Sequence, residues 1–316
     1  YKEFIKMNNN IIVQISEGLG NQLFMYAHAY ALSKDLNRNL LIDDTTSYYK
    51  KKTSLRAHQK FILNHFNIPN DLAPNNLKYD TSTKNIYKKI LLLIDRFKIK
   101  KKFLIEKKSS ENSKKIIENY SIKKMKFDKN LYIIGNYENE TYFSNFRSDL
   151  VNIFSPKIDY INLNHELISK LKNTNSVSIH VRRNRFSDQL GLSDNYYNNA
   201  KSDKFTDDII NYINRSISYF NEKVENPYYF IWSNNFENFN FIANKINTKK
   251  YELVKDNDVI NDFYLFGHAK HFIVGPSSFH WWGAWLNQNK NKLCLRPKNI
   301  NQSNNKNFWP ESWISV

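Results

Sequence analysis

Two adjacent arginines follow a β-branched run in the second half of the chain. Residues 177–181 alternate as a strand does, and His180, Arg182 and Arg183 stand at its carboxyl end. Ligands of open α/β sheets bind beyond such strand ends, and side chains two apart on a strand share a face. A guanidinium matches the paired oxygens of a diphosphate. We therefore predict an anion site at these three side chains, with a surface ion pair as the alternative.

A helix headed by hydroxyl groups gives the second candidate. A predicted strand ends in Gly-Pro, and Ser277 and Ser278 then open an aromatic-rich helix. The free N–H groups of a helix N-terminus bind phosphate readily, so we predict a second phosphate contact at this helix start. An aromatic ring close to it is suited to line a sugar or base pocket. We assign that part of the site to Phe279 and Trp282.

A glycine turn near the amino end gives the third candidate. The β-branched run 11–15 is followed by Gly18, Gly20, Asn21 and Gln22. Glycines let the chain turn tightly and let backbone N–H groups approach a ligand. An amide side chain at a helix N-terminus either caps the helix or reaches outwards. We predict contact with a bound ligand here, with a plain capped turn as the alternative.

An acidic pair suggests a rival, metal-dependent chemistry. Asp256 and Asp258 are spaced to hold Mn²⁺ or Mg²⁺ against a diphosphate. Asp258 also stands just before a predicted helix, where an aspartate is a favoured cap. We take the capping interpretation and expect no metal and no other cofactor. No spacing selects a catalytic base among Glu17, Asp43 and Asp44.

Strands and helices must position these residues, and the chain alternates the two. The first half has predicted strands over 11–15, 40–42 and 131–134 and a helix over 23–36. The second half has strands over 177–181, 228–232, 272–274 and 293–295 and helices over 205–220, 259–268 and 277–287. Such alternation predicts an α/β fold with two parallel-sheet domains and a cleft between them. We place the domains at 1–160 and 161–316, with residues 164–175 as the connection.

Composition bounds the location and the partners. The net charge is +17, Cys294 is the only cysteine, and no run approaches the ~20 apolar residues of a membrane span. We expect a cytoplasmic protein without an intrachain disulfide. Basic residues gather over about 84–126, which we interpret as a solvated helical insertion; the alternative is an amphipathic helix lying on an anionic membrane surface, which would make the protein peripheral on the inner membrane. The charge also raises nucleic-acid binding, but basic and aromatic residues do not interleave on a recognisable module, and we expect no nucleic-acid partner.

Together the motifs resemble the bacterial α-1,2-fucosyltransferase family, glycosyltransferase family 11. Residues 18–27, 180–183 and 262–287 are similar to its main blocks and stand in the same order. The resemblance implies a GT-B-type fold, in which two Rossmann-like domains face a cleft. It also implies inverting transfer of L-fucose, or a related deoxysugar, from a GDP donor to a hydroxyl of a glycan acceptor, such as a galactoside in surface polysaccharide or lipooligosaccharide synthesis.

The resemblance also implies roles for single residues. Arg182, His180 and Asn21 would be catalytic. Donor binding would fall to Gly18, Gly20, Gln22, Arg183, Ser233, Asn234, Asp262, Ser277, Ser278, Phe279 and Trp282. Residues 161–316 would bind the GDP-sugar, and residues 1–160 would form the acceptor side.

The chain departs from the family pattern at several positions. The usual Gly-Asp-Tyr after the arginines is Asn184-Arg185-Phe186, the usual Ser-Asp-Asp is Ser233-Asn234-Asn235, and a usual Ser is His280. Two carboxylates are thereby lost. These changes leave open a GDP donor with a sugar other than fucose, or a sugar-binding protein without catalysis. Glu17 stands where the family commonly has glycine, so it is no shared base. Acceptor, linkage and oligomeric state do not follow from the sequence.

Overall fold

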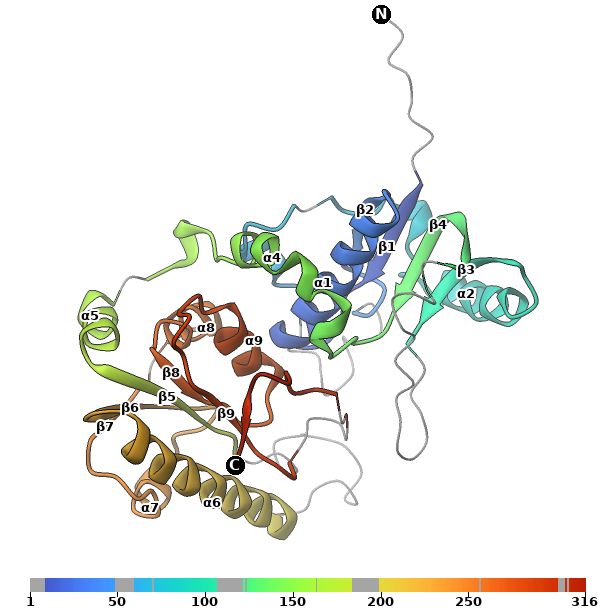
Figure 1. The fold of residues 1–316 in the computed structure, drawn as a ribbon. Coiled ribbons are helices and arrows are strands. Elements are labelled where there is room, and N and C mark those ends of the chain that lie inside the picture. The colour runs from blue at the N-terminus through green and yellow to red at the C-terminus, as the bar shows by residue number, and fades with distance from the viewer. Residues whose placement is uncertain are drawn as a thin grey trace, which may run out of the picture. The chain divides into compact units, whose positions relative to one another are not determined.

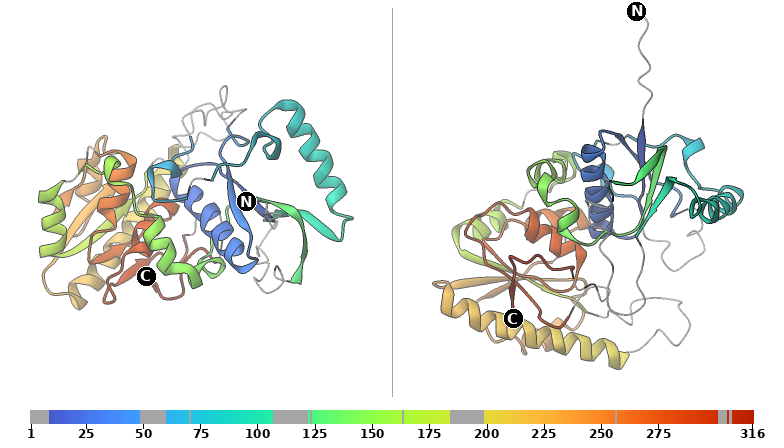
Figure 2. Two further views of the ribbon diagram at one scale, coloured as in Figure 1. Left: turned by 90° about the horizontal axis from the view of Figure 1, so that it is seen from above. Right: turned by 45° about the vertical axis from the view of Figure 1, so that its right-hand side comes forward.

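The computed structural model describes residues 9–48, 60–69, 71–106, 122, 124–162, 164–183, 199–255, 257–300, 305 and 307–316. The chain divides into two compact units, Tyr1–Phe154 (unit 1) and Ser155–Val316 (unit 2). Each unit has its own parallel sheet covered by helices (Figures 1 and 2). The predicted α/β fold of GT-B type, with two Rossmann-like domains, is confirmed in this sense. The division falls a few residues before the boundary placed between residues 160 and 161.

Unit 1 is built on a four-stranded sheet in the order β2-β1-β4-β3, with every neighbouring pair parallel. Its strands are β1 (Asn10–Gln14), β2 (Asn39–Asp43), β3 (Lys100–Ile105) and β4 (Lys126–Ile134). Its helices are α1 (Leu19–Asp35), α2 (Ser82–Asp95) and α4 (Arg147–Ile153). Short 3-10 turns are η2 (Leu63–His65), η3 (Asn75–Leu77), η4 (Glu140–Tyr142) and η5 (Ser144–Phe146).

Helix α1 is buried along most of its length because its side chains are apolar or small on nearly every side. Phe24, Ala27 and Ala31 are at most 1% exposed. A helix that is apolar all round belongs in an interior, and α1 packs on β1. The predicted strand, glycine turn, helix and strand at the amino end are therefore confirmed, and the turn lies at the carboxyl end of β1.

The basic segment around residues 84–126 is not one helical insertion. Helix α2 accounts for its first part, but β3 is a strand of the sheet and pairs with β4. Phe103 and Leu104 of β3 are buried, whereas Lys100 is exposed. Lysines are common on edge strands because charge discourages pairing with another chain. The many lysines of this segment are the reason why the strand was not predicted from the sequence. Residues 107–121 and 123 lie outside the described part of the chain.

Unit 2 is built on a six-stranded parallel sheet in the order β10-β9-β8-β5-β6-β7. Its strands are β5 (Asn175–Val181), β6 (Pro227–Ser233), β7 (Tyr251–Leu253), β8 (His271–Ile273), β9 (Cys294–Arg296) and β10 (Ile314–Ser315). Its helices are α5 (His165–Asn173), α6 (Asn199–Lys223), α7 (Phe239–Ala243), α8 (Val259–Phe266) and α9 (Ser278–Leu286), with a 3-10 turn η6 (Ile158–Tyr160). Cys294 is a buried free thiol on β9.

The strand order of unit 2 identifies where a ligand binds. Counted along the chain from β5, the strands lie 3-2-1-4-5-6 when read from β7 to β10, the order of dinucleotide-binding sheets. The order reverses between β5 and β8, which lie side by side. Ligands of such sheets bind in the crevice beyond the carboxyl ends of the two strands at this switch point.

The two faces of β5 serve different purposes. Val177, Ile179 and Val181 belong to the apolar cluster formed with α6. Ser178 and His180 point to the opposite face, where the Ser178 hydroxyl donates to the carbonyl of Phe266 in α8 (3.3 Å). Figure 1 shows α6 on one side of this sheet and α8 and α9 on the other. Strand alternation thus sends His180 towards α9.

The segment taken as a connection between the halves contains a helix. Asn164 caps α5 by accepting from the N–H of Leu167 (3.0 Å), and Leu167 and Leu171 are buried. Two leucines in a lysine- and asparagine-rich stretch carry too little apolar periodicity to predict a helix. The helix packs on β5, and this packing stabilises it where the helix propensity of its residues is weak. Within the described residues, no helix is long and apolar enough to cross a membrane.

Candidate functional site

The switch point of unit 2 brings together the motif that ends β5, with His180 and Arg182, and the serine-headed helix α9. The ring of His180, at the end of β5, stacks on that of His280 in α9, with centroids 3.6 Å apart and planes 18° from parallel. Gly275 follows β8, and a Cβ there would lie 3.0 Å from the His180 carbonyl oxygen and 3.1 Å from its Nδ1. The glycine therefore lets the turn before α9 pass directly over β5.

The first turn of α9 offers backbone donors to an anion. Ser277 is the N-cap residue, but its side chain makes no capping hydrogen bond. Its hydroxyl lies 3.4 Å from Nδ1 of His280. The first N–H groups of a helix have no partner within the helix, and its dipole favours negative charge at this end. The N–H of Ser277 donates to the carbonyl of Gly275 (2.8 Å), so Ser278 and Phe279 carry the N–H groups suited to phosphate, and their contact with a donor stays a prediction.

The two histidines of the site are neutral at physiological pH. Burial, and then the positive charge of Arg182, lower the pKa of His180 to about 3. Burial, His180 and Arg182 also lower the pKa of His280. Arg182 therefore lies close enough to both rings to act on them, and it supplies the positive charge of the site. We correct the expectation for His180: it contributes a neutral ring, not a cation, to an anion site. Its Nδ1 is buried and has no hydrogen-bond partner among the described residues.

Arg183 braces a loop in this structure. Its guanidinium donates to the carbonyls of Asn235 (3.2 Å) and Glu237. The Asn234 side chain accepts from the Arg183 N–H (2.8 Å) and donates to its carbonyl (3.1 Å). Ser233 bridges the same strand ends, since its hydroxyl lies 3.0 Å from the carbonyl of Val181. These bonds hold the backbone on either side of Arg182. Direct contact of Arg183, Ser233 and Asn234 with the donor stays a prediction.

The aromatic residues of α9 divide between surface and core. Phe279 is partly exposed and packs edge-on against Phe263 of α8, with centroids 5.6 Å apart. Trp282 is fully buried and contacts Trp281 and Trp285. We therefore correct the expectation for Trp282, which supports the helix from the core. The ligand contact predicted for Phe279 stays a prediction.

Asp262 lies in the first turn of α8, next to Phe263. Burial raises its pKa to about 6, with Asp258 adding to the rise and a hydrogen bond from Asn257 opposing it. Its Oδ1 is buried without a partner among the described residues. A carboxyl with these properties beside an aromatic contact of α9 is consistent with a functional role, and its predicted donor contact stays a prediction.

The glycine turn of unit 1 is used differently from the prediction. Gly18 is the N-cap residue of α1, and a Cβ there would meet no described atom within 4 Å. The left-handed conformation falls instead on Glu17, with φ of 65°. Its carboxylate accepts from the amide of Asn21, whose own Oδ1 is buried and unpartnered in the described part of the chain. Gly20 is buried in the first turn of α1. The amide of Asn21 is thus held at the helix start, where its predicted catalytic role stays a prediction.

Gln22 has a structural role, which we call a strut: its buried amide joins separate segments of unit 1. It is fully buried, and its Nε2 lies within hydrogen-bond distance of the carbonyls of Glu17 (2.9 Å) and Lys60 (2.8 Å) and of the hydroxyl of Tyr48 (3.2 Å), which share its two hydrogens. Its carbonyl oxygen accepts from the N–H of Ile62 (3.1 Å). Both ends of the amide are therefore bonded within unit 1. We correct the expectation that Gln22 reaches the donor.

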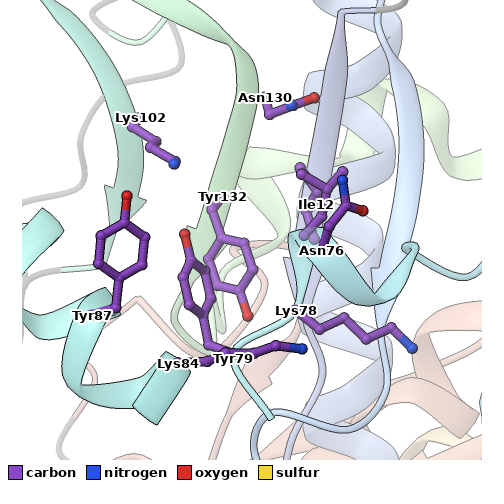
Figure 3. A pocket seen from close by; sticks show the side chains of 10 residues that line it. Ile12, Asn76, Lys78, Tyr79, Lys84, Tyr87, Lys102, Asn130 and Tyr132 are labelled. Carbon is purple, nitrogen blue, oxygen red and sulfur yellow. The ribbon is translucent and has the colours of Figure 1, made fainter. Parts of the chain in front are cut away.

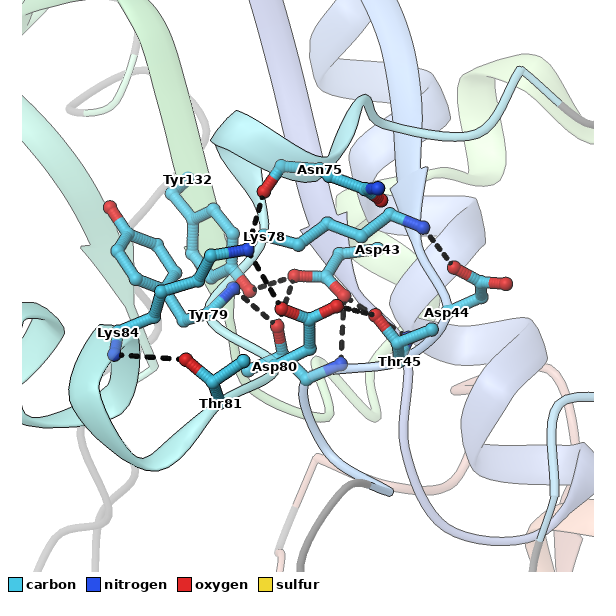
Figure 4. A network of polar contacts seen from close by, with 11 residues as sticks. Asp43, Asp44, Thr45, Asn75, Lys78, Tyr79, Asp80, Thr81, Lys84 and Tyr132 are labelled. Atoms are coloured by element: carbon cyan, nitrogen blue, oxygen red, sulfur yellow. Dashed lines mark hydrogen bonds and ion pairs between the residues drawn. The ribbon is translucent and has the colours of Figure 1, made fainter.

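Two of the three carboxylates considered as bases are structural. Figure 4 shows Asp43 at the centre of a polar network: it accepts from the N–H groups of Thr45 (3.2 Å) and Thr46 (2.9 Å) and from the hydroxyl of Tyr132. Asp44 is paired with Lys78. These bonds and the ion pair hold Asp43 and Asp44 in place, and Glu17 accepts from the amide of Asn21. Spacing along the chain did not reveal the role of Asp43, because its bond from Tyr132 joins residues 89 positions apart.

Of the acidic pair, only Asp258 lies within the described residues. Asp258 caps α8 by accepting from the N–H groups of Ile260 (2.8 Å) and Asn261 (2.9 Å), which confirms the capping interpretation. Asp256 lies outside the described residues, as do Asn184, Arg185 and Phe186. Metal independence stays a prediction.

The sequence did not predict the histidine stack. His280 stood out only as a replacement for a serine, and nothing in the spacing placed it against a residue one hundred positions earlier. The glycine at 275 was a signal that could have found it, because glycine after a strand indicates a close approach of another backbone.

Comparison with known proteins agrees with this geometry. Residues 10–315 match the sequence model of the family described as glycosyl transferase family 11. An Escherichia coli protein described as alpha-1,2-colitosyltransferase is 29% identical over 326 residues, 97% of this chain and 98% of its own length. The Escherichia coli O-antigen biosynthesis glycosyltransferase WbnK is 27% identical over 327 residues, 96% of this chain and 99% of its own length. Among solved structures, a mutant of Arabidopsis thaliana FUT1 in complex with GDP is similar in fold, with a TM-score of 0.51, 13% identity, and 93% of this chain and 72% of that chain covered.

Two units with parallel sheets agree with a GT-B-type fold, and the family match makes the chain a glycosyltransferase. The match covers nearly the whole chain and gives the family as well. The chain belongs to glycosyl transferase family 11.

Proposed function

We propose that this glycosyltransferase transfers a GDP-linked deoxysugar, L-fucose or a close relative, to a hydroxyl of a glycan acceptor with inversion at the anomeric carbon. The observation that carries the proposal is the switch point of unit 2, where the Arg182 charge and the α9 N-terminus meet beside two neutral histidines. The colitosyltransferase among the relatives supports a deoxysugar donor.

The chemistry follows from where charge develops. Breaking the bond between a sugar and a diphosphate builds positive charge on the sugar, as in an oxocarbenium ion, and negative charge on the leaving diphosphate. Fixed cations and backbone dipoles stabilise the departing charge. Arg182 and the N–H groups of the first α9 turn provide both, and the acceptor hydroxyl attacks from the opposite face of the sugar ring. We propose that no metal ion is needed for this step.

Replacement of Arg182 tests the donor site. Removing one such donor costs about 10²–10³ in rate. We expect Arg182→Ala to lower consumption of the GDP-sugar by at least that factor while the melting temperature stays within the range of a surface substitution. Arg215→Ala is the matched control, because Arg215 is exposed on α6. Full turnover by Arg182→Ala, or an equal loss in Arg215→Ala, contradicts the proposal.

The metal-free mechanism has a test of its own. The rate of transfer in EDTA is expected to equal the rate in added Mn²⁺, and strict dependence on the metal would overturn the metal-free mechanism.

The donor sugar is tested by direct competition. The carboxylates usual at 185 and 234 are replaced here, and His280 occupies a position that is serine in the family pattern. We propose that these changes select among GDP-linked deoxysugars. GDP-fucose and GDP-colitose supplied together, with mass spectrometry of the product, show which sugar is transferred. If neither GDP-sugar is hydrolysed and neither sugar is transferred, the result would support a sugar-binding protein without catalysis.

We propose a surface-polysaccharide or lipooligosaccharide glycan, such as a galactoside, as the acceptor. The O-antigen glycosyltransferase among the relatives supports this class. We also propose that the enzyme works in the cytoplasm at an anionic membrane surface, where lipid-linked glycans are assembled. A panel of β-galactosides, compared with other glycosides of the same size, tests the acceptor class by product formation.

A further inference from the structure

Helix α2 presents its apolar face to solvent. Ile86 is 59% exposed, Ile90 49%, Leu93 57% and Ile94 47%, and Phe97 just beyond the helix is 90% exposed. These positions are three to four residues apart, so they line one stripe of the helix. Tyr87 (55%) and Ile99 (82%) extend the stripe. Single exposed apolar residues are ordinary, but a contiguous stripe of this kind marks an interaction surface.

The polar residues of α2 hold this orientation in place. Lys88 is buried, donates to the side-chain oxygen of Gln14 (3.0 Å) and lies 5.6 and 5.8 Å from the ring centroids of Tyr79 and Tyr132. Asp95 is buried on the same side. Leu91 and Leu92 also face inwards and pack on an apolar cluster of unit 1, so α2 is apolar on its inner face and on its outer face. An ordinary surface helix carries polar residues on the outer face.

The carboxylate of Asp95 fixes the other end of the helix. It accepts from the N–H groups of Lys102 (2.8 Å) and Phe103 (3.3 Å) at the start of β3. Turning the apolar stripe inwards would expose this carboxylate's buried bonds and leave two N–H groups of β3 unpaired. The outward position of the stripe is thus a property of the fold and not of a loosely attached helix.

Every exposed charge along α2 and the turn to β3 is positive. These side chains are Lys89, Arg96, Lys98 and Lys100, all exposed, whereas Asp95 is buried. A pocket at the side of the helix adds Lys84 and Lys102; Figure 3 shows the rings of Tyr79 and Tyr132 between Tyr87 and Lys102 on one side and Ile12 on the other. An apolar stripe bordered by cations complements a bilayer with anionic headgroups.

We propose that the outer face of α2 is a membrane-docking surface, which lies along the headgroup region of an anionic bilayer. We call it the α2 surface, meaning Ile86, Ile90, Leu93, Ile94 and Phe97 with the cations Lys89 and Arg96. The apolar stripe enters the boundary of the acyl chains, and the cations contact lipid phosphates. This assignment gives a physical basis to the membrane location in the proposed function, but it does not depend on the donor or on catalysis.

Vesicle binding of the full chain tests the α2 surface. Co-sedimentation is measured with vesicles of phosphatidylcholine alone and of phosphatidylcholine with phosphatidylglycerol, without any GDP-sugar. We expect binding to the anionic vesicles only. The double variant Leu93→Asn, Phe97→Asn should bind at least about tenfold more weakly, and Lys89→Gln, Arg96→Gln about fivefold more weakly for each removed cation.

Matched controls come from unit 2. Phe241→Asn with Ile158→Asn removes equally exposed apolar side chains (68% and 69%), and Lys223→Gln with Lys249→Gln removes exposed cations. Both controls should bind vesicles as the unaltered chain does. Because the altered side chains are exposed, unchanged melting curves are expected for every variant.

Three results would overturn the proposal. They are absence of binding to anionic vesicles, equal binding by the α2 variants and the unaltered chain, and a lipid-free dimer that the Leu93 and Phe97 changes dissociate. The last result would assign the face to a second copy of the chain. Donor hydrolysis or transfer to a free glycan is measured in parallel, so that failure of the membrane proposal is separated from failure of the proposed function.

Discussion

At the scale of single residues, the neutral histidines explain how one cation can serve the site. His180 and His280 stack and share a buried position, and Arg182 lowers the pKa of both rings. If either ring were protonated, its charge would repel Arg182 and distort the arrangement. Kept neutral, the rings hold the end of β5 against the start of α9 and leave the positive potential of the site to Arg182 and the helix terminus.

A buried histidine of unit 1 gives a pH prediction. Burial lowers the pKa of His28 to about 3 from an ordinary 6.5, so its neutral form is favoured in the folded state. The unfolded chain therefore binds a proton first as the pH falls, and this histidine's contribution to stability is lost progressively from pH 6.5 down to about 3. At pH 5 the loss is about 2 kcal/mol relative to pH 7.5.

His28→Phe tests this pH dependence, because a phenyl ring can keep the stack on Tyr137, 3.8 Å away between centroids. Denaturant unfolding at pH 7.5 and pH 5 should show a smaller difference in unfolding free energy for the variant than for the unaltered chain, by roughly 2 kcal/mol. An identical acid sensitivity in both would show that the ring of His28 is protonated without unfolding.

Gln22 gives a prediction that separates a strut from a donor ligand. Its removal leaves the buried carbonyl oxygens of Glu17 and Lys60 and the Ile62 N–H without this partner. We expect Gln22→Ala to lower the unfolding free energy by roughly 2–4 kcal/mol, because each unsatisfied buried group costs about 1–3 kcal/mol. The Kd of GDP for the folded fraction should stay unchanged. A stable variant with weakened GDP binding would restore Gln22 to the donor site.

Residue chemistry was predictable from the sequence where it depends on neighbours along the chain. Arginine after a strand and serine before a helix define their surroundings locally, so the location of Arg182 and Ser277 at strand and helix ends followed from the pattern. Gln22 and Trp282 were misassigned because their surroundings come from residues far away in the sequence. Motif membership alone does not distinguish a ligand contact from a strut beneath it.

At the scale of elements, two glycines set how closely α8 and α9 pack. A Cβ on Gly283 would lie 2.7 Å from Cδ1 of Phe266, and a Cβ on Gly267 would lie 3.2 Å from the Gly283 carbonyl oxygen. Since the N-terminus of α9 is proposed to bind the donor phosphate, this close packing fixes the proposed site over β5. The aromatic density of α9 serves the same end, because Trp281 and Trp282 anchor the helix in the core.

Gly283→Ala is predicted to disturb this packing. The added methyl group displaces Phe266, and overpacking of this kind costs about 1–3 kcal/mol. Thermal unfolding measures the loss. Gly18→Ala is the matched control, because its added Cβ would meet no described atom within 4 Å and its φ of −82° suits any residue. That control should keep or slightly raise stability. An equal loss in both variants would mean that the packing of α8 on α9 is not limiting.

Two of the missed elements share a cause. Strand β3 and helix α5 are short, rich in lysine, and apolar at only two buried positions each, Phe103 and Leu104 or Leu167 and Leu171. Local propensity is weak in such segments, and contacts with β4 and β5 decide their structure. The strands near the centres of the sheets, β1 and β5, were found because both of their faces are covered and their sequences are continuously apolar or alternate clearly.

At the scale of the whole molecule, alternation along the chain predicted two α/β units, but not their strand orders. The order 3-2-1-4-5-6 arises because the chain crosses back from β7 to β8 beside β5, a choice that no short segment encodes. Once known, the order locates the ligand crevice without any bound molecule, and Arg182 after β5 and Ser277 after β8 lie close to the two strand ends that flank it.

The switch point lies wholly within unit 2, which leads to a prediction for the separated unit. Strands β5 and β8 and helix α9 all belong to Ser155–Val316, and this unit has its own apolar cluster. We expect a fragment of residues 155–316 to fold and to bind GDP within roughly tenfold of the affinity of the full chain, a difference of about 1.4 kcal/mol. Calorimetric titration measures both. The same fragment carrying Arg182→Ala should fold and lose GDP binding. A folded fragment that fails to bind GDP would show that residues of unit 1, with Asn21 the first candidate, hold the nucleotide as well.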